Sequence, residues 1–511
     1  MSDLFTQAGT AALAVVSGVL LALSFPTFGH PAIGWVALTP LLVALHGGSR
    51  PFLLRAFSLG WIAGVVYFAA TLYWITNVMT MYGGLQPVVA VLVNALLVFY
   101  LALFPALFAV VVRRLGFSFG PRALMAAPFV WVATELGRTH LFTGFPWVLL
   151  GYSQVTTVPV AQIASVFGVY GVSALVASVS AAAALSAITR SMRMRIEAVG
   201  AVVILVFAAA AWGGARAARA ELTREGVSVK VGLVQGNASE QQRRDPVDGP
   251  RLVQDHIRLS RQAIGGGAEL VLWPESALTP YRFDDPAAAG LVRRLAREGR
   301  ASILIGSDQV ERGQPDRWFN SAFLVGADGS DAGFYRKMHL VPFGEYVPLR
   351  NLLFFAAPLV EAIGSGFAAG EDPTILPVNG HAISVAICYE VVYPSLVRQF
   401  VLRGSELLAT ITNDAWFGRT SAPYQHFAQA SMRAIEEGRY LIRAANTGVS
   451  GIVDPYGRVL ERTDIFQQAV LVGQARFLTG TTVYARYGDF FAYACVVLTV
   501  LLLVTARRQA R

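Results

Sequence analysis

Apolar residues are distributed along the chain in three different ways. Up to about residue 214, long apolar runs follow one another with only short turns between them. From 216 to about 480, short apolar runs alternate with charged, amphipathic windows, and one long apolar run returns at 488–506. A membrane helix needs about 20 predominantly apolar residues. We therefore predict a membrane bundle at 1–215, an extramembrane domain at 216–480, and a last membrane span with a basic tail at 481–511.

The long runs contain eight candidate membrane spans. They lie at 7–25, 31–46, 56–77, 86–112, 122–138, 158–188, 196–214 and 488–506. The second run is short and flanked by proline, so a tilted or partly re-entrant course is an alternative for it. The first run could instead be a cleaved signal peptide, but it continues into Ser24-Phe25-Pro26 without a convincing cleavage site. We therefore expect an α-helical bundle of eight transmembrane helices.

Composition and charge support a membrane protein and indicate its orientation. The chain is 55% hydrophobic and 14% charged, with a mean hydropathy of +0.52. Its net charge of +9 does not indicate binding to nucleic acid, because the basic residues of the apolar part lie at the ends of the apolar runs and not in one patch. Arginines cluster in alternate short loops, at Arg50 and Arg55, at Arg113, Arg114 and Arg122, at Arg190, Arg193 and Arg195, and in the C-terminal tail. Such loops stay in the cytoplasm, so we expect residues 216–480 in the periplasm, on the outer face of a bacterial inner membrane.

The extramembrane domain shows a β–α alternation. Strands are predicted at 229–235, 269–274, 302–306, 320–326, 382–388 and 407–413, and helices at 250–265, 286–297, 394–403 and 423–438. This alternation is typical of an α/β sandwich in which helices cover the sheets.

Three polar residues occupy strand ends or adjoining loops of this domain. Glu275 follows Trp273-Pro274, Lys337 lies in a loop rich in proline and glycine, and Cys388 ends an apolar run. Strand ends are common places for chemistry in α/β proteins. Taken singly, each residue also has an ordinary structural interpretation: a solvated glutamate, a capping or pairing lysine, and a cysteine that packs as a small hydrophobe. With only two cysteines in the chain, a free thiol is expected at position 388.

The motifs around these residues form a specific set. In chain order they are W-P-E at 273–275, R-K-x-H-L-x-P-F-G-E-Y at 336–346 and C-Y-E at 388–390. This set resembles the nitrilase (carbon–nitrogen hydrolase) superfamily. The resemblance implies a four-layer αββα sandwich and a triad of Glu275, Lys337 and Cys388. In such a triad, the glutamate takes the proton of the thiol and the lysine stabilises the oxyanion of a tetrahedral intermediate. An acyl thioester on the cysteine results.

The same resemblance implies three supporting active-site residues, Glu345, Tyr389 and Glu390. Glu345 could orient Lys337 or Glu275, and Glu390 could position the end of the nucleophile's strand, but either could equally hold its loop structurally. The sequence departs from the family at one point. Where the family often has a tryptophan, this chain has Q-Q-R-R-D at 241–245. The departure puts an aromatic role there in doubt and leaves the triad intact.

The arrangement of the whole chain resembles the apolipoprotein N-acyltransferase family, with an apolar N-terminal block, a nitrilase-like domain and one last span. Further matching segments are 24–26, 61–74, Glu135 with 143–147, 234–237 and 412–418. The resemblance implies transfer of a fatty acyl chain from a membrane phospholipid to the α-amino group of the diacylglyceryl-cysteine of an apolipoprotein. This is the last step of bacterial lipoprotein maturation. We expect a monomer that is integral to the membrane and binds no nucleic acid.

Two functions from other classes remain alternatives. A membrane-anchored nitrilase-type amidase would hydrolyse a small amide with the same triad, with water as acceptor. A transporter or scaffold would be expected to have paired polar residues in its spans or an internal repeat. Only Glu135 and Arg138 qualify, either as a functional pair or as a structural one.

Two further expectations concern a loop and the cofactors. The apolar segment 352–367 is either an interfacial flap that touches lipid or a packed part of the sandwich. The histidines show no paired ligand spacing and no glycine-rich phosphate loop is present, so we expect neither a metal nor a nucleotide cofactor.

Overall fold

The computed structural model describes residues 2–27, 29–46, 53–245, 247–279, 282–346 and 366–509. The chain falls into two compact units. The first comprises Met1–Thr76, Pro87–Arg219 and Tyr487–Arg511, and the second comprises Asn77–Gln86 and Ala220–Arg486. The segment 352–367, interpreted above as a flap or a packed loop, lies outside the described residues except for its last two positions.

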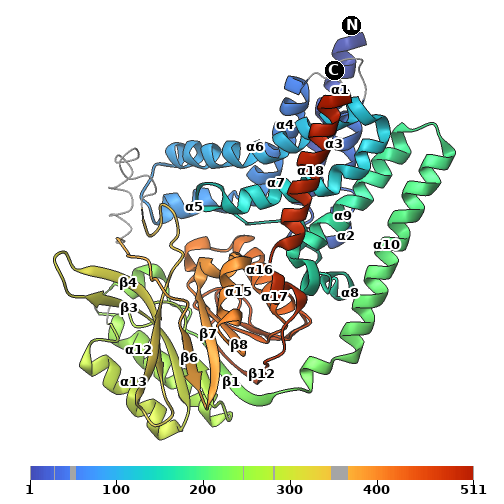
Figure 1. Cartoon of the computed structure of the whole chain (residues 1–511). Helices are drawn as coiled ribbons and strands as arrows, with labels where there is room; N and C mark the ends of the chain where they lie inside the picture. Colours follow the sequence, from blue (N-terminus) through green and yellow to red (C-terminus); the bar gives the residue numbers. More distant parts are fainter. Residues whose placement is uncertain are drawn as a thin grey trace. The chain divides into compact units, whose positions relative to one another are not determined.

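The first unit consists of helices. Its longer helices are α1 (Ser2–Ala22), α4 (Leu53–Thr71), α6 (Pro87–Phe119), α7 (Ala127–His140), α9 (Ala164–Ile188), α10 (Met192–Arg219) and α18 (Phe490–Gln509). Within this unit α4 packs against α1 and α6, and α18 runs beside α7 (Figure 1). Gly64 makes the contact between α4 and α6 possible, because a Cβ there would lie 2.8 Å from the Cα of Ala102. Small residues at such contacts are typical of helix packing in membranes.

Five segments of the described chain are long and apolar enough to cross a membrane. They are Leu53–Thr71, Pro87–Thr143, Ala164–Ile188, Met192–Thr223 and Phe490–Gln509, and two shorter apolar segments are Ala8–Ala22 and Pro31–Ala44. The predicted span at 31–46 consists of two short helices, α2 (Pro31–Gly34) and α3 (Thr39–Ala44). Pro40 lies in the first turn of α3, a position that proline tolerates although it cannot continue a preceding helix. The predicted number of eight spans is therefore not confirmed.

Glu135 and Arg138 of α7 bind the main chain of the segment that follows this helix. A Glu135 carboxylate oxygen accepts from the backbone N–H of Leu150 at 2.7 Å, and Arg138 donates to the carbonyls of Phe145 at 3.2 Å and Trp147 at 2.6 Å. Both charged side chains are buried. Because buried backbone groups need partners, these bonds give the two residues a structural role within the helical unit.

The second unit contains two six-stranded sheets. The first sheet has the order β12 (Ala469–Phe477), β1 (Val227–Gln235), β2 (Leu270–Leu272), β3 (Ser302–Glu311), β4 (Arg317–Val325), β5 (Asp331–Arg336). The second has the order β11 (Val459–Arg462), β10 (Gly451–Val453), β9 (Leu441–Ala445), β8 (Leu407–Thr412), β7 (His381–Ile387), β6 (Ile375–Val378). The central strands β1 to β3 and β7 to β9 run parallel within their sheets.

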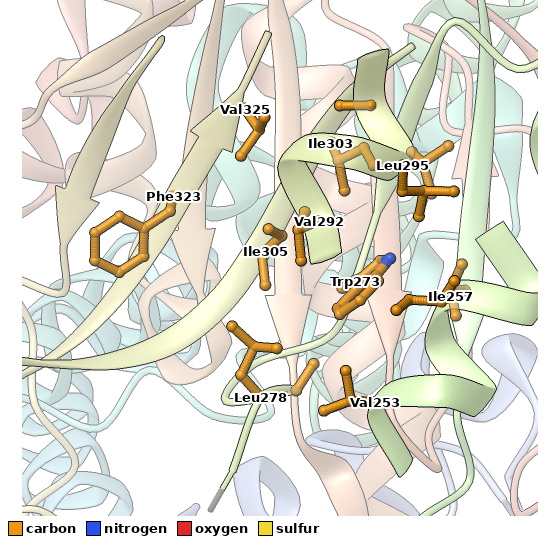
Figure 2. Close-up of a cluster of buried hydrophobic side chains, with 14 of the residues drawn as sticks. Val253, Ile257, Trp273, Leu278, Val292, Leu295, Ile303, Ile305, Phe323 and Val325 are labelled. Atoms are coloured by element: carbon orange, nitrogen blue, oxygen red, sulfur yellow. The ribbon is translucent and has the colours of Figure 1, made fainter. Parts of the chain in front are cut away.

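The two sheets pack on each other and helices cover their outer faces. Strand β1 contacts β9 and β4 contacts β7, while α12 (Gly249–Gly265) and α13 (Pro286–Gly299) lie on the first sheet. Figure 2 shows the core between these helices and that sheet, with Trp273 beside Ile257 of α12 and Val292 of α13 near Ile305 of β3. Helices α15 (Pro394–Leu402) and α16 (Ala422–Glu437) contact the second sheet. The predicted αββα sandwich is therefore confirmed.

The six predicted strands and four predicted helices of this domain are present, with ends that differ by a few residues. The prediction missed β5, β6 and β9 to β12. Strand β9 was hidden because Arg443 interrupts its apolar run, although that side chain is fully buried. The three residues of the predicted triad follow strands of both sheets. Glu275 follows β2 and Lys337 follows β5 in the first sheet, and Cys388 follows β7 in the second.

The short stretch Asn77–Gln86 packs with the second unit rather than with the helices that flank it in sequence. The Tyr82 hydroxyl donates to the carbonyl of Ala415 at 3.0 Å, and the Tyr82 ring meets Trp416 edge to face, with centroids 4.7 Å apart. Both partners lie in the turn η7 (Asp414–Phe417) that follows β8. This stretch thus supports the turn at the end of a central strand.

Candidate active site

Cys388 lies where β7 ends, as the first residue of the short helix η6 (Cys388–Val392). Its side chain is buried, and its backbone φ is 53°, in the left-handed region that non-glycine residues seldom adopt. A conformation of this kind costs on the order of 1–3 kcal/mol and persists only where the surroundings hold it. The surrounding structure therefore holds the backbone of Cys388 in this left-handed conformation.

Glu275 follows β2 and is held by donors from three directions. One carboxylate oxygen accepts from the side-chain amide of Asn320 at 2.7 Å and from Lys337 at 3.4 Å. The other oxygen accepts from the backbone N–H of Asn413 at 2.9 Å. These bonds fix the orientation of a buried carboxylate, which a general base requires.

Lys337 follows β5 and is almost completely buried, with a side-chain exposure of 1%. Its ammonium group lies 2.8 Å from a carboxylate oxygen of Glu345 and 3.4 Å from one of Glu275. Burial alone would lower the pKa of Lys337, but the charges of Glu345 and Glu275 outweigh it and raise the pKa above its usual value. The lysine therefore stays cationic, as an oxyanion stabiliser must be.

The Cys388 thiol is affected by both of these charges. Burial raises the pKa of the thiol above its usual value, Glu275 raises it further, and Lys337 acts in the opposite direction. The resting thiol is consequently neutral. Since the thiolate is the nucleophile, it has to form as the proton leaves for a base, and Glu275 is the carboxylate whose charge acts on the thiol most strongly.

Glu345 and Glu390 hold the loops that surround the triad. Glu345 accepts from Lys337, from Asn320 at 3.1 Å and from the backbone N–H of Val341 at 2.7 Å. Glu345 could orient either Lys337 or Glu275, and its direct contact is with Lys337. Its link to Glu275 is indirect, because Asn320 donates to both carboxylates.

Glu390 joins the loop after β5 to the end of β7. It accepts from the Tyr335 hydroxyl at 2.6 Å and from the backbone N–H groups of Met338 at 2.7 Å, His339 at 3.1 Å and Ile387 at 2.7 Å. Burial raises the pKa of Glu390 to about 7, while these donors favour its charged form. This carboxylate therefore fixes the segment that bears Lys337 next to the residue that precedes Cys388.

Tyr389 belongs to a cluster of aromatic rings. Its ring meets Tyr393 edge to face, with centroids 5.2 Å apart, and lies 5.9 Å from the ring of His339, which itself lies 3.8 Å from Tyr393. The cluster packs the turn after the nucleophile against the loop after Lys337. Tyr389 thus contributes to the packing of these two segments.

The segment at which the sequence departs from the family falls on α11 (Glu240–Arg244). Arg243 donates to Glu240 and to the carbonyl of Ser276, each at 2.6 Å, and the side-chain amide of Asn413 donates to Glu240. The segment therefore supports the loop after Glu275 through charged groups.

Sequence analysis did not single out Asn320 or Asn413, which both bind Glu275 directly. Asn320 could have been noticed as an amide at the start of the buried part of β4. Asn413 lies in the segment 412–418, which resembles the apolipoprotein N-acyltransferase family, but the sequence alone does not show that its backbone N–H binds Glu275. Among the residues that the structure describes, no group of three or more His, Cys, Asp or Glu side chains is arranged to hold a metal ion.

Comparisons with known proteins match both units. Residues 17–182 match the family model of the apolipoprotein N-acyltransferase N-terminal domain, and residues 230–478 match that of carbon-nitrogen hydrolases. A protein of Geobacter metallireducens named apolipoprotein N-acyltransferase is 43% identical over 97% of this chain and 95% of its own length. A protein of Methylococcus capsulatus with the same name is 36% identical over 98% of this chain and 96% of its own length.

Solved structures resemble about half of the chain. An amidase from Nesterenkonia sp. shares 20% identity with a TM-score of 0.39, over 53% of this chain and 97% of the amidase.

Proposed function

The chain belongs to the apolipoprotein N-acyltransferase family, and we propose that it transfers a fatty acyl chain from a membrane phospholipid through a thioester on Cys388. The acceptor is the N-terminal amino group of the diacylglyceryl-cysteine of an apolipoprotein. The observation that carries this proposal is the buried network in which Lys337 contacts Glu275 and Glu345, with both triad charges acting on a thiol at a strained strand end.

The first half-reaction forms the thioester. Glu275 removes the proton of the Cys388 thiol while the sulfur attacks the ester carbonyl carbon of the phospholipid. Lys337 stabilises the negative charge that develops on the carbonyl oxygen. The intermediate then collapses, the C–O bond of the ester breaks, and the lysophospholipid alkoxide takes the proton from Glu275. The acyl group remains bound to sulfur.

The second half-reaction reverses the roles of these groups. The free amine of the apolipoprotein attacks the thioester carbonyl, Lys337 again stabilises the oxyanion, and Glu275 takes a proton from the nitrogen. The C–S bond breaks, and the leaving thiolate is protonated by Glu275. The sum is an ester converted to an amide with no change of oxidation state, so the reaction needs no redox cofactor.

This proposal includes the position of the chain in the membrane. We propose eight spans, with the domains 1–215, 216–480 and 481–511, and with the catalytic domain in the periplasm. The alternate arginine clusters support this orientation. The change of unit at Arg219 and at Tyr487 supports the boundaries of the domains. We propose that the protein acts as a monomer.

Orientation is testable with two single cysteines in a Cys388→Ala, Cys495→Ala background. Position 193 lies in the first turn of α10, within the arginine cluster at 190–195, and position 314 lies in the catalytic domain. Both positions are exposed, so Arg193→Cys and Gln314→Cys suit the labelling. A membrane-impermeant thiol reagent added to intact cells with a permeabilised outer membrane should label position 314 and leave 193 unlabelled until the inner membrane is opened. Labelling of 193 alone would contradict the periplasmic placement.

The nature of the acceptor distinguishes acyl transfer from the amidase alternative. We expect purified protein, given phospholipid with a labelled acyl chain, to transfer the label to a diacylated lipopeptide as an amide and to release one lysophospholipid per transfer. A lipopeptide with an acetylated amino terminus serves as the matched control and should receive none. Release of the label as free fatty acid, at a rate independent of the lipopeptide, would contradict acyl transfer.

A further inference from the structure

His426 on α16 is fully buried and contacts the main chain of the nucleophile. Its Nε2 lies 3.1 Å from the carbonyl oxygen of Cys388. Its Nδ1 lies 2.9 Å from a guanidinium nitrogen of Arg443 on β9 and 3.1 Å from a carboxylate oxygen of Asp414. Asp414 and Arg443 are likewise fully buried, and they form an ion pair at 3.0 Å. None of these three side chains takes a proton or bears the acyl group in the reaction described above.

The carbonyl of Cys388 assigns the proton on Nε2 of His426. A carbonyl oxygen can only accept, so Nε2 carries a hydrogen and donates it to Cys388. Nδ1 faces both an obligate donor, Arg443 at 2.9 Å, and an obligate acceptor, Asp414 at 3.1 Å, and both contacts are compatible with the hydrogen on Nε2. Burial and the charge of Arg443 lower the pKa of His426, against the opposing effect of Asp414.

Asp414 is stabilised as an anion by the same cluster. Although burial alone would raise the pKa of Asp414, the charge of Arg443 and the bond with His426 lower it to about 2. The carboxylate also accepts from the Thr412 hydroxyl at 2.8 Å. The three side chains therefore form one buried, hydrogen-bonded group, and Nε2 of His426 reaches from it to the carbonyl of Cys388.

The main chain is thus held on both sides of Cys388. Glu390 accepts from the N–H of the preceding residue, Ile387, and His426 donates to the carbonyl of Cys388 itself. The φ of Cys388 is 53°, so this residue would relax toward an ordinary conformation if one of these bonds were lost. Rotation of this backbone moves the Cβ and with it the sulfur.

We propose that His426 is a positioning residue, which holds the carbonyl of Cys388 through Nε2 and so keeps the sulfur aimed at the acyl carbonyl. This inference rests on the proposed function of Cys388 as nucleophile. Its contribution is geometric, because displacement of a reacting atom by about 1 Å can cost on the order of a hundredfold in rate.

Two substitutions separate the donor from the bulk of the ring. His426→Gln places an amide N–H near the position of Nε2, whereas His426→Asn places it near Nδ1 and leaves the carbonyl of Cys388 without this donor. The test is the first-order rate at which the acyl adduct forms on Cys388 with excess phospholipid, followed by intact mass. The half-saturating concentration of the lipid is determined in the same experiment. The control is His256→Asn, because His256 is also fully buried and bonds to a main-chain carbonyl, that of Leu252 in its own helix.

The expected results are specific to the donor. The Gln variant should be acylated within about tenfold of the wild type, and the Asn variant about a hundredfold more slowly than the wild type at an unchanged half-saturating concentration. The His256→Asn control should keep the wild-type rate within a few-fold at an equal folded fraction. Equal rates for the Gln and Asn variants, or a Gln variant that fails to fold while the Asn variant folds, would overturn the proposal. A wild-type protein that forms no adduct would instead count against the proposed function.

A measurement on the wild type decides the matter if neither variant folds. The chain has two cysteines, so labelling of cysteine carbonyl carbons with ¹³C and of histidine ring nitrogens with ¹⁵N gives few pairs. A hydrogen bond at the observed length places Nε2 roughly 4 Å from the carbonyl carbon of Cys388. Solid-state dipolar recoupling at that distance, from a protonated ring nitrogen, would support the proposal. Absence of such a coupling would overturn it.

Discussion

Lys337→Met is expected to slow the acylation of Cys388 by about a hundred- to a thousandfold. Removal of one oxyanion stabiliser costs roughly 2.7–4 kcal/mol in the transition state. Methionine has a similar volume, so the pocket should stay filled while the charge next to Glu345 and Glu275 is lost. Lys337→Arg should not restore the rate, because a planar guanidinium does not replace a compact ammonium group.

Single-turnover kinetics with phospholipid alone measure this effect directly. Lys230→Met on the exposed side of β1 is the matched control and should keep the wild-type rate. Thermal unfolding of each variant verifies that the comparison is made between folded proteins, since the loss of Lys337 leaves two buried carboxylates without their cation. Near-normal acylation in Lys337→Met would remove this lysine from the mechanism.

Cys388→Ala is expected to abolish both the acyl adduct and N-acylation. Without the sulfur no group in the buried network can form the thioester, and Glu275 retains only its role as a base. Cys388→Ser should keep the fold but turn over very slowly, because an alcohol is a much weaker nucleophile than a thiolate. The other cysteine gives the control: Cys495→Ala in α18 should leave the rate of adduct formation unchanged. Acyl transfer that continued in Cys388→Ala would place the nucleophile elsewhere.

The motifs and the polarity pattern allowed much of this site to be predicted. Glu275 and Cys388 each follow an apolar run that proved to be a strand, whereas the strand before Lys337, β5, was not predicted and this lysine was found from its motif alone. The structure places Lys337 and Glu275 in one hydrogen-bonded network with Glu345. The chemical role of each residue rests on the proposal above and on the experiments that test it.

The parts that could not be predicted depend on pairing between distant segments. Arg443 breaks an apolar run, so its strand was overlooked. The partners that make a buried charge possible there, Asp414 and His426, come from distant segments. His426 lies 38 positions after Cys388, on a helix whose alignment with β7 is set by packing and not by spacing. Asn320 is a single amide in a strand, and its two carboxylate partners come from other loops.

The membrane part illustrates a different limit. Hydropathy located the long helices, but it could not show that the run at 31–46 contains two short helices. A hydropathy window averages over local breaks, and Pro40 sits at such a break. The predicted spans at 86–112 and 122–138 correspond to two separate helices, α6 and α7, that pack against each other.

The mass of the intact protein after incubation with phospholipid alone tests the central claim most directly. The account predicts that the wild type gains the mass of one fatty acyl group, releases one equivalent of lysophospholipid and loses the adduct on treatment with hydroxylamine, as a thioester does. Addition of a diacylated lipopeptide with a free amino terminus should then discharge the adduct to the amine. A wild-type protein that gains no acyl mass, or an adduct that water discharges as fast without the lipopeptide as with it, would contradict two-step acyl transfer through Cys388.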